Sequence, residues 1–199
     1  MSVRFGVDLG GTKIALVALD AAGAEVYRRR VPTPASEGAE AIVRAIRDLV
    51  HAAESAIGRP GSVGLGTPGA LSPATGLLRN SNTTALNGRP LDRELAAALG
   101  RPVRLANDAN CFALSEASDG AAAGAEVVFG VIVGTGTGGG VIVRGRALTG
   151  PNAIAGEWGH TPLPWPTPDE VPGPPCYCGR RGCVETWLSG PGLARDHEA

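Results

Sequence analysis

This 199-residue chain has no long apolar run and no excess of charge of one sign. A transmembrane helix needs roughly 18 or more consecutive apolar residues, and no such run occurs. The start, from Met1 to Phe5, enters a strand-like pattern without the apolar region of a signal peptide. With 18 basic and 19 acidic residues, the chain shows no basic surface for nucleic acid or for a membrane. We therefore expect a cytoplasmic protein with neither kind of partner.

Aromatic residues and cysteines are also scarce. Aromatics make up 4% of the chain, and its 4 cysteines are too few and too clustered for a secreted disulfide framework. Hydrophobic residues reach 43% and charged residues 19%, a balance that excludes intrinsic disorder. The 30 glycines are clustered rather than periodic, which excludes collagen and points to sites built from backbone.

Apolar periodicity predicts an α/β fold in which strands alternate with helices. Strands are expected at 5–9, 14–19, 26–31, 62–66, 102–106, 127–133 and 141–143, and helices at 91–99 and 109–118. A further helix is expected where the period changes from Ser36, with its apolar face over 42–57 and its end at Gly58. Each half of the chain contains an apolar hairpin with a Gly/Thr tip, which suggests a duplicated plan. We divide the chain into an N-terminal domain over residues 1–118 and a second domain over residues 119–199.

Two glycine-rich turns are candidate phosphate sites. Asp8 ends a strand beside Gly10-Gly11-Thr12-Lys13, a turn that offers backbone N–H groups, a hydroxyl and a cation, although an ordinary hairpin turn is the alternative. The second turn, Gly134-Thr135-Gly136-Thr137-Gly138-Gly139-Gly140, favours a phosphate cradle because so many glycines weaken a sheet without adding packing. A Rossmann site is excluded because no helix follows the Gly-x-Gly-x-x-Gly segments at 64–69 and 134–139.

Asn107-Asp108 lies where a predicted strand ends and a helix begins. Aspartate is favoured there simply as a helix N-cap. The other interpretation is a general base at the C-terminal edge of a strand, where α/β active sites lie, for a hydroxyl that attacks a γ-phosphate. The local sequence leaves both interpretations open.

Three cysteines lie within eight residues, at Cys176, Cys178 and Cys183. This spacing predicts a metal site, with His160 as the nearest upstream candidate for the fourth ligand of a tetrahedral zinc. Redox chemistry or chance clustering is the alternative, but two glycines between the last two cysteines favour a tight knuckle. Cys111, within a predicted helix, is expected to be a buried small hydrophobe.

In this order, these segments resemble the ROK family of sugar kinases, and most closely its bacterial fructokinases (manno-fructokinases). The resemblance covers essentially the whole chain. It is carried by Asp8 to Lys13, Asn107 to Asn110, Gly134 to Gly140, Gly156 to His160, and Cys176 to Glu185. It implies the actin/hexokinase-like (ribonuclease H-like) two-domain kinase fold.

The resemblance also implies an activity, the ATP-dependent phosphorylation of a hexose hydroxyl, with D-fructose giving fructose 6-phosphate. Asp108 would be the general base, Asp8 would position Mg²⁺, and the two glycine turns would face the ATP phosphates. Sugar binding would involve Asn82, Asn107, Asp108, Glu157, His160 and Glu185. Structural zinc on His160 and the three clustered cysteines would shape the sugar site. Kinases of glucose, mannose or N-acetylglucosamine are the alternatives.

The sequence departs from the family pattern after the cysteine segment. Family members continue well beyond it, whereas this sequence ends at Ala199. We expect a C-terminally truncated chain with an incomplete second domain and no adenosine half-site, which binds sugar but is weakly active or inactive alone. The resemblance also suggests a homodimer. A sugar-responsive repressor is disfavoured, because those members carry a helix-turn-helix ahead of the first glycine turn.

Overall fold

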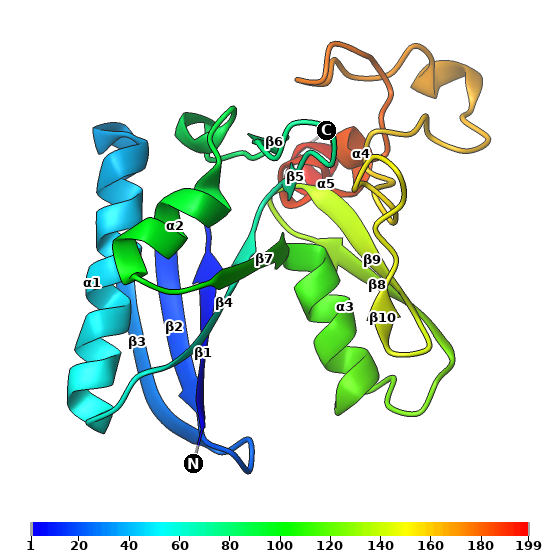
Figure 1. The fold of residues 1–199 in the computed structure, drawn as a ribbon. Helices are drawn as coiled ribbons and strands as arrows, with labels where there is room; N and C mark the ends of the chain where they lie inside the picture. The colour runs from blue at the N-terminus through cyan, green and yellow to red at the C-terminus, as the bar shows by residue number, and fades with distance from the viewer. Residues whose placement is uncertain (1, 199) are drawn as a thin grey trace. The chain divides into compact units, whose positions relative to one another are not determined.

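The computed structural model describes residues 2–198, which separate into two compact units (Figure 1). Unit 1 extends to Asp108 and unit 2 begins at Ala109. The division falls at the start of a helix, whereas the domain boundary expected from the sequence, after Ser118, lies at the end of that helix. The expected boundary stays a prediction about folding domains. No helix among residues 2–198 is long and apolar enough to cross a membrane.

Unit 1 is built on a five-stranded sheet with the order β3-β2-β1-β4-β7. Its strands are β1 (Val3–Leu9), β2 (Lys13–Leu19), β3 (Glu25–Pro32), β4 (Gly61–Thr67) and β7 (Val103–Asn107). The first three form an antiparallel meander, and β4 and β7 run parallel to β1. Because β1, β4 and β7 are parallel, their carboxyl ends reach the same edge of the sheet.

Two helices, α1 (Ala39–Ile57) and α2 (Leu91–Leu99), complete the core of unit 1 (Figure 1). Every second residue of β1 is buried, and the apolar stripe of α1 is buried at helical spacing, so strand and helix share one apolar core. Both helices end where the sequence predicted, at Gly58 and Gly100, which adopt left-handed φ values of 79° and 66°. α1 begins at Ala39, after Ser36, where the sequence period changes, and before Ile42, the first residue of its predicted apolar face.

The connection between β4 and α2 contains only short elements. These are β5 (Ala70–Leu71), which pairs with β6 (Leu78–Arg79), and the 3₁₀ helix η2 (Thr84–Leu86). Another 3₁₀ helix, η1 (Ala35–Glu37), precedes α1. This connection is rich in glycine, proline and asparagine, a composition typical of loops, and most of it is loop.

Unit 2 combines α3 (Asp108–Ser118), whose first residue closes unit 1, with a three-stranded sheet ordered β10-β9-β8. The strands are β8 (Val127–Val133), β9 (Thr137–Val143) and β10 (Arg146–Ala147). Helix and sheet approach closely at two glycines. A Cβ on Gly130 would lie 2.7 Å from Cβ of Ala113, and one on Gly140 would lie 2.6 Å from the carbonyl oxygen of Ala109.

The second glycine-rich turn is shorter than the sequence indicated, because β9 begins at Thr137 and takes in the last three glycines. The expectation that these glycines add no packing is wrong. A Cβ on Gly139 would lie 2.7 Å from the ring of Phe129, and Gly140 lies against α3. Here the absence of a side chain lets backbone and ring pack closely, and the turn itself spans residues 134–136.

β8 carries apolar side chains on both faces. Gly130 and its alternate neighbours face α3, and the other face is formed by Val127, Phe129, Val131 and Val133. These four side chains are between 45% and 64% exposed. An edge strand of this composition is unusual, because exposed edges in soluble proteins are normally charged or interrupted.

The rest of unit 2 is mostly loop, including the proline-rich stretch at 161–175. It contains the 3₁₀ helix η3 (Pro168–Glu170), the cysteine segment, and the short helices α4 (Glu185–Leu188) and α5 (Gly190–His197). Ser189 caps α5 by accepting a hydrogen bond from the N–H of Gly192.

Candidate functional site

The parallel strands of unit 1 bring Asp8, Asn107 and Asp108 to one edge of the sheet. Asp8 is in register with Gly66 on β4, and Thr67 with Asn107 on β7. The buried Asn107 amide donates a 3.2 Å hydrogen bond from Nδ2 to the carbonyl of Gly69. This bond fixes the end of β7, from which Asp108 begins α3.

The two carboxylates at this edge influence one another. Asp8 lies on the more open face of β1, yet partial burial raises its pKa, and the negative charge of Asp108 raises it further. The positive charge of Lys13 acts in the opposite direction. Two carboxylates that repel one another beside a turn of backbone N–H groups favour a bound cation or a shared proton.

The first glycine turn lies next to Asn82. Gly10 closes the turn by donating a 2.9 Å hydrogen bond to the carbonyl of Lys13. A Cβ on Gly11 would lie 3.9 Å from both Oδ1 of Asn82 and Oγ1 of Thr83. The Thr83 hydroxyl belongs to a residue only 4% exposed and has no hydrogen-bond partner within residues 2–198. A buried hydroxyl without a hydrogen-bond partner destabilises the folded chain, so a bound ligand that accepts or donates such a bond would be stabilised there.

The second glycine turn is held by the helices that follow the cysteine segment. The N–H of Thr137 donates a 2.8 Å hydrogen bond to Oε2 of Glu185, and the N–H of Gly190 donates a 2.7 Å bond to the carbonyl of Gly134. A Cβ on Gly136 would lie 2.6 Å from Oε2 of Glu185. The buried Thr137 hydroxyl, like that of Thr83, finds no partner in the described part of the chain.

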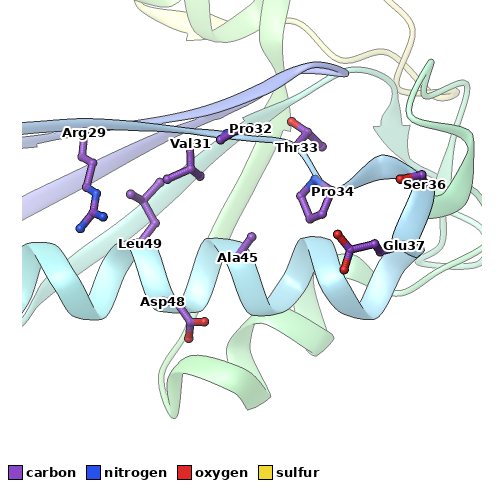
Figure 2. Close-up of a pocket in the computed structure, with 10 residues that line it drawn as sticks. All are labelled: Arg29, Val31, Pro32, Thr33, Pro34, Ser36, Glu37, Ala45, Asp48 and Leu49. Carbon is purple, nitrogen blue, oxygen red and sulfur yellow. The ribbon is translucent and has the colours of Figure 1, made fainter.

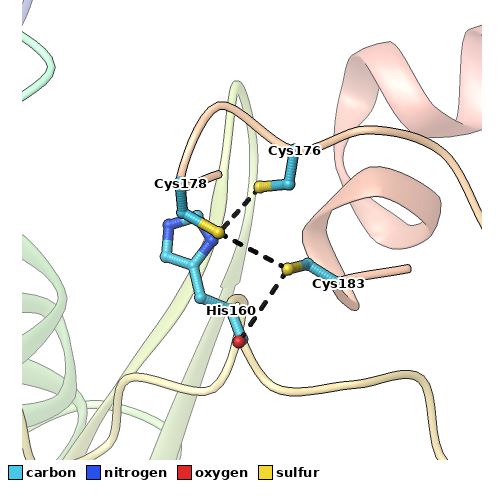
Figure 3. Close-up of side chains that lie close together, drawn as sticks. All are labelled: His160, Cys176, Cys178 and Cys183. Carbon is cyan, nitrogen blue, oxygen red and sulfur yellow. Dashed lines mark hydrogen bonds between the residues drawn. The ribbon is translucent and has the colours of Figure 1, made fainter. Parts of the chain in front are cut away.

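The structure brings the four predicted metal ligands together, as Figure 3 shows. The ligand atoms of His160, Cys176, Cys178 and Cys183 lie within 4.8 Å of one another. The Sγ atoms of Cys178 and Cys183 are 3.7 Å apart, and Nδ1 of His160 is 3.4 Å from Sγ of Cys176. A tetrahedral zinc with Zn–S bonds of about 2.3 Å has S–S edges of about 3.8 Å. Donor types and spacing therefore fit zinc.

The thiols of this cluster are in unequal surroundings. Burial raises the pKa of the Cys183 thiol, and with the added effect of hydrogen bonds to Cys178 and Cys176 it reaches about 12. The backbone N–H of Arg180 lowers the pKa of Cys178. A buried thiol of this kind ionises when a cation takes the place of its proton, as a metal ion does.

One residue of this region was not singled out from the sequence. The hydroxyl of Tyr177 lies 3.0 Å from Nε2 of His160, and the two rings meet edge to face with centroids 5.0 Å apart. Partial desolvation of the phenol, together with the negative charge of Glu185, raises the pKa of Tyr177 to about 12. In the sequence, its position between the predicted ligands Cys176 and Cys178 was the one sign that it lies at this site.

Glu157 and the residues after it run beside the start of β9. A Cβ on Gly138 would lie 3.4 Å from Oε2 of Glu157. Trp158 donates a 2.9 Å hydrogen bond from Nε1 to the carbonyl of Gly138, and its ring meets that of Phe129 edge to face. Glu157 itself is exposed.

The predicted site residues therefore form two groups, one in each unit. Unit 1 holds the first glycine turn with Asp8, Asn82, Asn107 and Asp108, and unit 2 holds the second glycine turn with Glu157, His160, Glu185 and the cysteines. A hollow of about 550 Å³ lies elsewhere, between β3 and α1 (Figure 2). It is lined by Arg29, Val31, Thr33, Ala45 and Leu49 among others, and by none of the predicted site residues.

Comparisons with known proteins identify the family of this chain. Residues 4–199 match the ROK family. The N-acetyl-D-glucosamine kinase of Pectobacterium atrosepticum is 45% identical over 193 residues, which cover 95% of this chain and 63% of that protein. The Escherichia coli O9:H4 protein of the same name is 44% identical and is covered over 64% of its length. The chain thus spans less than two thirds of these relatives, and the expected similarity to fructokinases is not supported by their names.

Solved structures confirm the expected actin/hexokinase-like α/β fold. A ROK hexokinase from Thermus thermophilus superposes with a TM-score of 0.81 at 41% identity, over 98% of this chain and 63% of the hexokinase. A ROK glucokinase from Streptomyces griseus, solved with glucose and AMPPNP, gives 0.79 at 34% identity, over 98% of this chain and 59% of the glucokinase.

Proposed function

This chain belongs to the ROK family, and from that premise we propose that it carries the sugar- and phosphate-binding residues of an ATP-dependent hexose kinase for N-acetyl-D-glucosamine. The observation that carries the kinase assignment is the carboxylate pair, Asp8 and Asp108, beside the first glycine turn. The sugar is inferred from relatives of 45% and 44% identity that bear this name. N-acetyl-D-glucosamine therefore replaces fructose, the substrate expected from the sequence.

Asp108 is the proposed general base. Its place at the end of β7 gives a carboxylate that can accept the proton of a sugar hydroxyl as that oxygen attacks the γ-phosphate. The buried and hydrogen-bonded Asn107 holds the strand end from which Asp108 projects. General-base catalysis typically contributes about 10²- to 10⁴-fold in rate.

Asp8 and the glycine turns are the proposed contacts of the nucleotide phosphates. Magnesium bound with ATP would neutralise phosphate charge, and the repulsion between Asp8 and Asp108 makes Asp8 a fitting neighbour for it. The buried, unpartnered hydroxyls of Thr83 and Thr137, one beside each glycine turn, are donors suited to phosphate oxygens.

Zinc is the proposed occupant of the cysteine and histidine cluster. Held by Nδ1 of His160 and the three thiolates, it would fix the imidazole and leave Nε2 directed away from the cluster. Glu185 follows the last cysteine and bonds to Thr137. His160, Glu185 and the exposed Glu157 are the proposed partners of the sugar hydroxyls in unit 2, and Asn82 and Asn107 those in unit 1.

The test separates sugar binding from phosphoryl transfer, because the chain spans 63% of its relative's length. Binding of N-acetylglucosamine, glucose, mannose and fructose is measured by calorimetry, and transfer from ATP by detecting the sugar phosphate. We expect N-acetylglucosamine to bind tightest and Asp108→Asn to reduce transfer at least about 100-fold with little change in sugar affinity. Sugar binding without transfer would support the alternative of a sugar-binding chain, and no binding of any hexose would refute both.

A further inference from the structure

The hydroxyl of Tyr177 forms a hydrogen bond with a nitrogen of His160 that would contact the sugar in the proposed site. It lies 3.0 Å from Nε2 of His160, on the side of the imidazole opposite the cluster-facing Nδ1. The residue is 84% exposed and makes one edge-to-face ring contact, with His160. Because little apolar packing holds the ring, its position depends mainly on the hydrogen bond between its hydroxyl and His160.

With zinc on Nδ1 of His160, Nε2 carries the ring proton and donates it to the tyrosine oxygen. A sugar hydroxyl held by His160 would accept the same proton. The tyrosine oxygen therefore takes the hydrogen-bond position that a sugar oxygen would need at this imidazole.

We propose that Tyr177 is a displaceable plug of the sugar site, whose hydroxyl must leave Nε2 of His160 before a sugar hydroxyl takes its place. The proposal rests on the proposed function, since it requires His160 to be a sugar contact. The exposed ring can swing towards solvent without opening the core, so displacement breaks the hydrogen bond to His160 and little else. Tyr177 is therefore a determinant of sugar affinity.

The first test removes the hydroxyl and keeps the ring. Tyr177→Phe should lower the Kd for N-acetylglucosamine about threefold to tenfold, the range expected when a competing hydrogen bond of ordinary net strength is lost. Tyr27, the other of the chain's 2 tyrosines, lies on β3, and Tyr27→Phe is the matched control with no expected change. Zinc content is measured in both variants, so that a change in the cluster is recognised.

The second test observes the native position directly. In the Tyr27→Phe background, 3-fluorotyrosine labels position 177 alone, and its single ¹⁹F resonance should shift when the sugar saturates the site. A sugar-binding chain whose resonance does not move, or whose Kd is unchanged or raised in Tyr177→Phe, would overturn the plug and leave the proposed function standing. Loss of all hexose binding in wild type and Tyr177→Phe alike would overturn both.

Discussion

The backbone N–H of Thr137 donates a 2.8 Å hydrogen bond to Oε2 of Glu185, so one carboxylate joins the second glycine turn to the helix that follows the cysteine cluster. A residue proposed to contact sugar therefore also fixes a turn proposed to contact phosphate. The two half-sites of unit 2 are expected to respond together when Glu185 is changed.

Glu185→Ala should both loosen the second glycine turn and weaken sugar binding. A hydrogen bond to a charged acceptor is worth about 1.5–3 kcal/mol, so the variant should lose roughly tenfold or more in sugar affinity and should melt at a lower temperature. Amide exchange at residues 134–137 should accelerate. Glu185→Gln, which keeps an oxygen acceptor, should preserve the exchange rates better than the sugar affinity. Unchanged exchange in Glu185→Ala would show that the turn is held by other contacts.

Metal removal should destabilise unit 2. The purified chain should contain one zinc per molecule by elemental analysis, and a chelator should lower the melting temperature, because ligand binding to the folded state stabilises it. Cys183→Ser should lower zinc content, whereas Cys111→Ser, on α3 and outside the cluster, should keep it. A metal-free chain with an unchanged melting temperature would contradict the zinc assignment.

Ionisation of Asp8 should make the folded chain less stable as the pH rises. Its pKa is higher in the folded chain than in the unfolded chain, chiefly through burial and the charge of Asp108, so the folded state holds the proton more tightly. Stability is therefore lost as the pH rises from the ordinary carboxyl pKa through the raised one. Asp8→Asn removes this effect and should melt above wild type at neutral pH, while the difference vanishes in strong acid.

The control for this prediction is Asp119→Asn, an exposed position in the other unit. It should not reproduce the pH-dependent gain. Asp8→Asn should also lose phosphoryl transfer wherever wild type shows it, since the proposed magnesium neighbour is gone. Destabilisation by Asp8→Asn at neutral pH would mean that the carboxylate is satisfied by partners and is not strained by Asp108.

The open apolar face of β8 should make the chain self-associate. Val127 is 64% exposed and Val131 is 45% exposed on the same face of an edge strand. The double variant Val127→Thr with Val131→Thr keeps β-branched residues but adds hydroxyls. It should bind less of a dye that fluoresces on apolar surfaces, and its average mass in ultracentrifugation should rise less with concentration. Val26→Thr, with 45% exposure on β3, is the matched control. Equal association in all three proteins would exclude β8 as the contact.

Local pattern was enough to predict most elements of the fold. The helix ends at Gly58 and Gly100, the two apolar hairpins and the convergence of His160 with the clustered cysteines all depend on residues close in sequence or on fixed spacing. Those features have short-range physical causes, such as left-handed glycine caps and the geometry of a tight knuckle.

Long-range packing could not be predicted in the same way. Gly140 must be glycine because α3, which lies far earlier in the chain, passes directly over it. The bond from Thr137 to Glu185 joins residues 48 positions apart, and nothing local marks it. The motifs also did not identify the hexose, because their resemblance pointed to fructose, whereas the relatives from Pectobacterium atrosepticum and Escherichia coli O9:H4 are named N-acetyl-D-glucosamine kinases. The homodimer and the cytoplasmic location stay predictions.

The most direct test of the proposed function is a calorimetric titration of the 199-residue chain, loaded with zinc, with N-acetylglucosamine and separately with fructose. The proposal predicts saturable one-to-one binding of N-acetylglucosamine and weaker or undetectable binding of fructose. Tighter binding of fructose would contradict the proposed substrate, and the absence of binding by either sugar or by any other hexose would contradict the assignment of these residues to a sugar site.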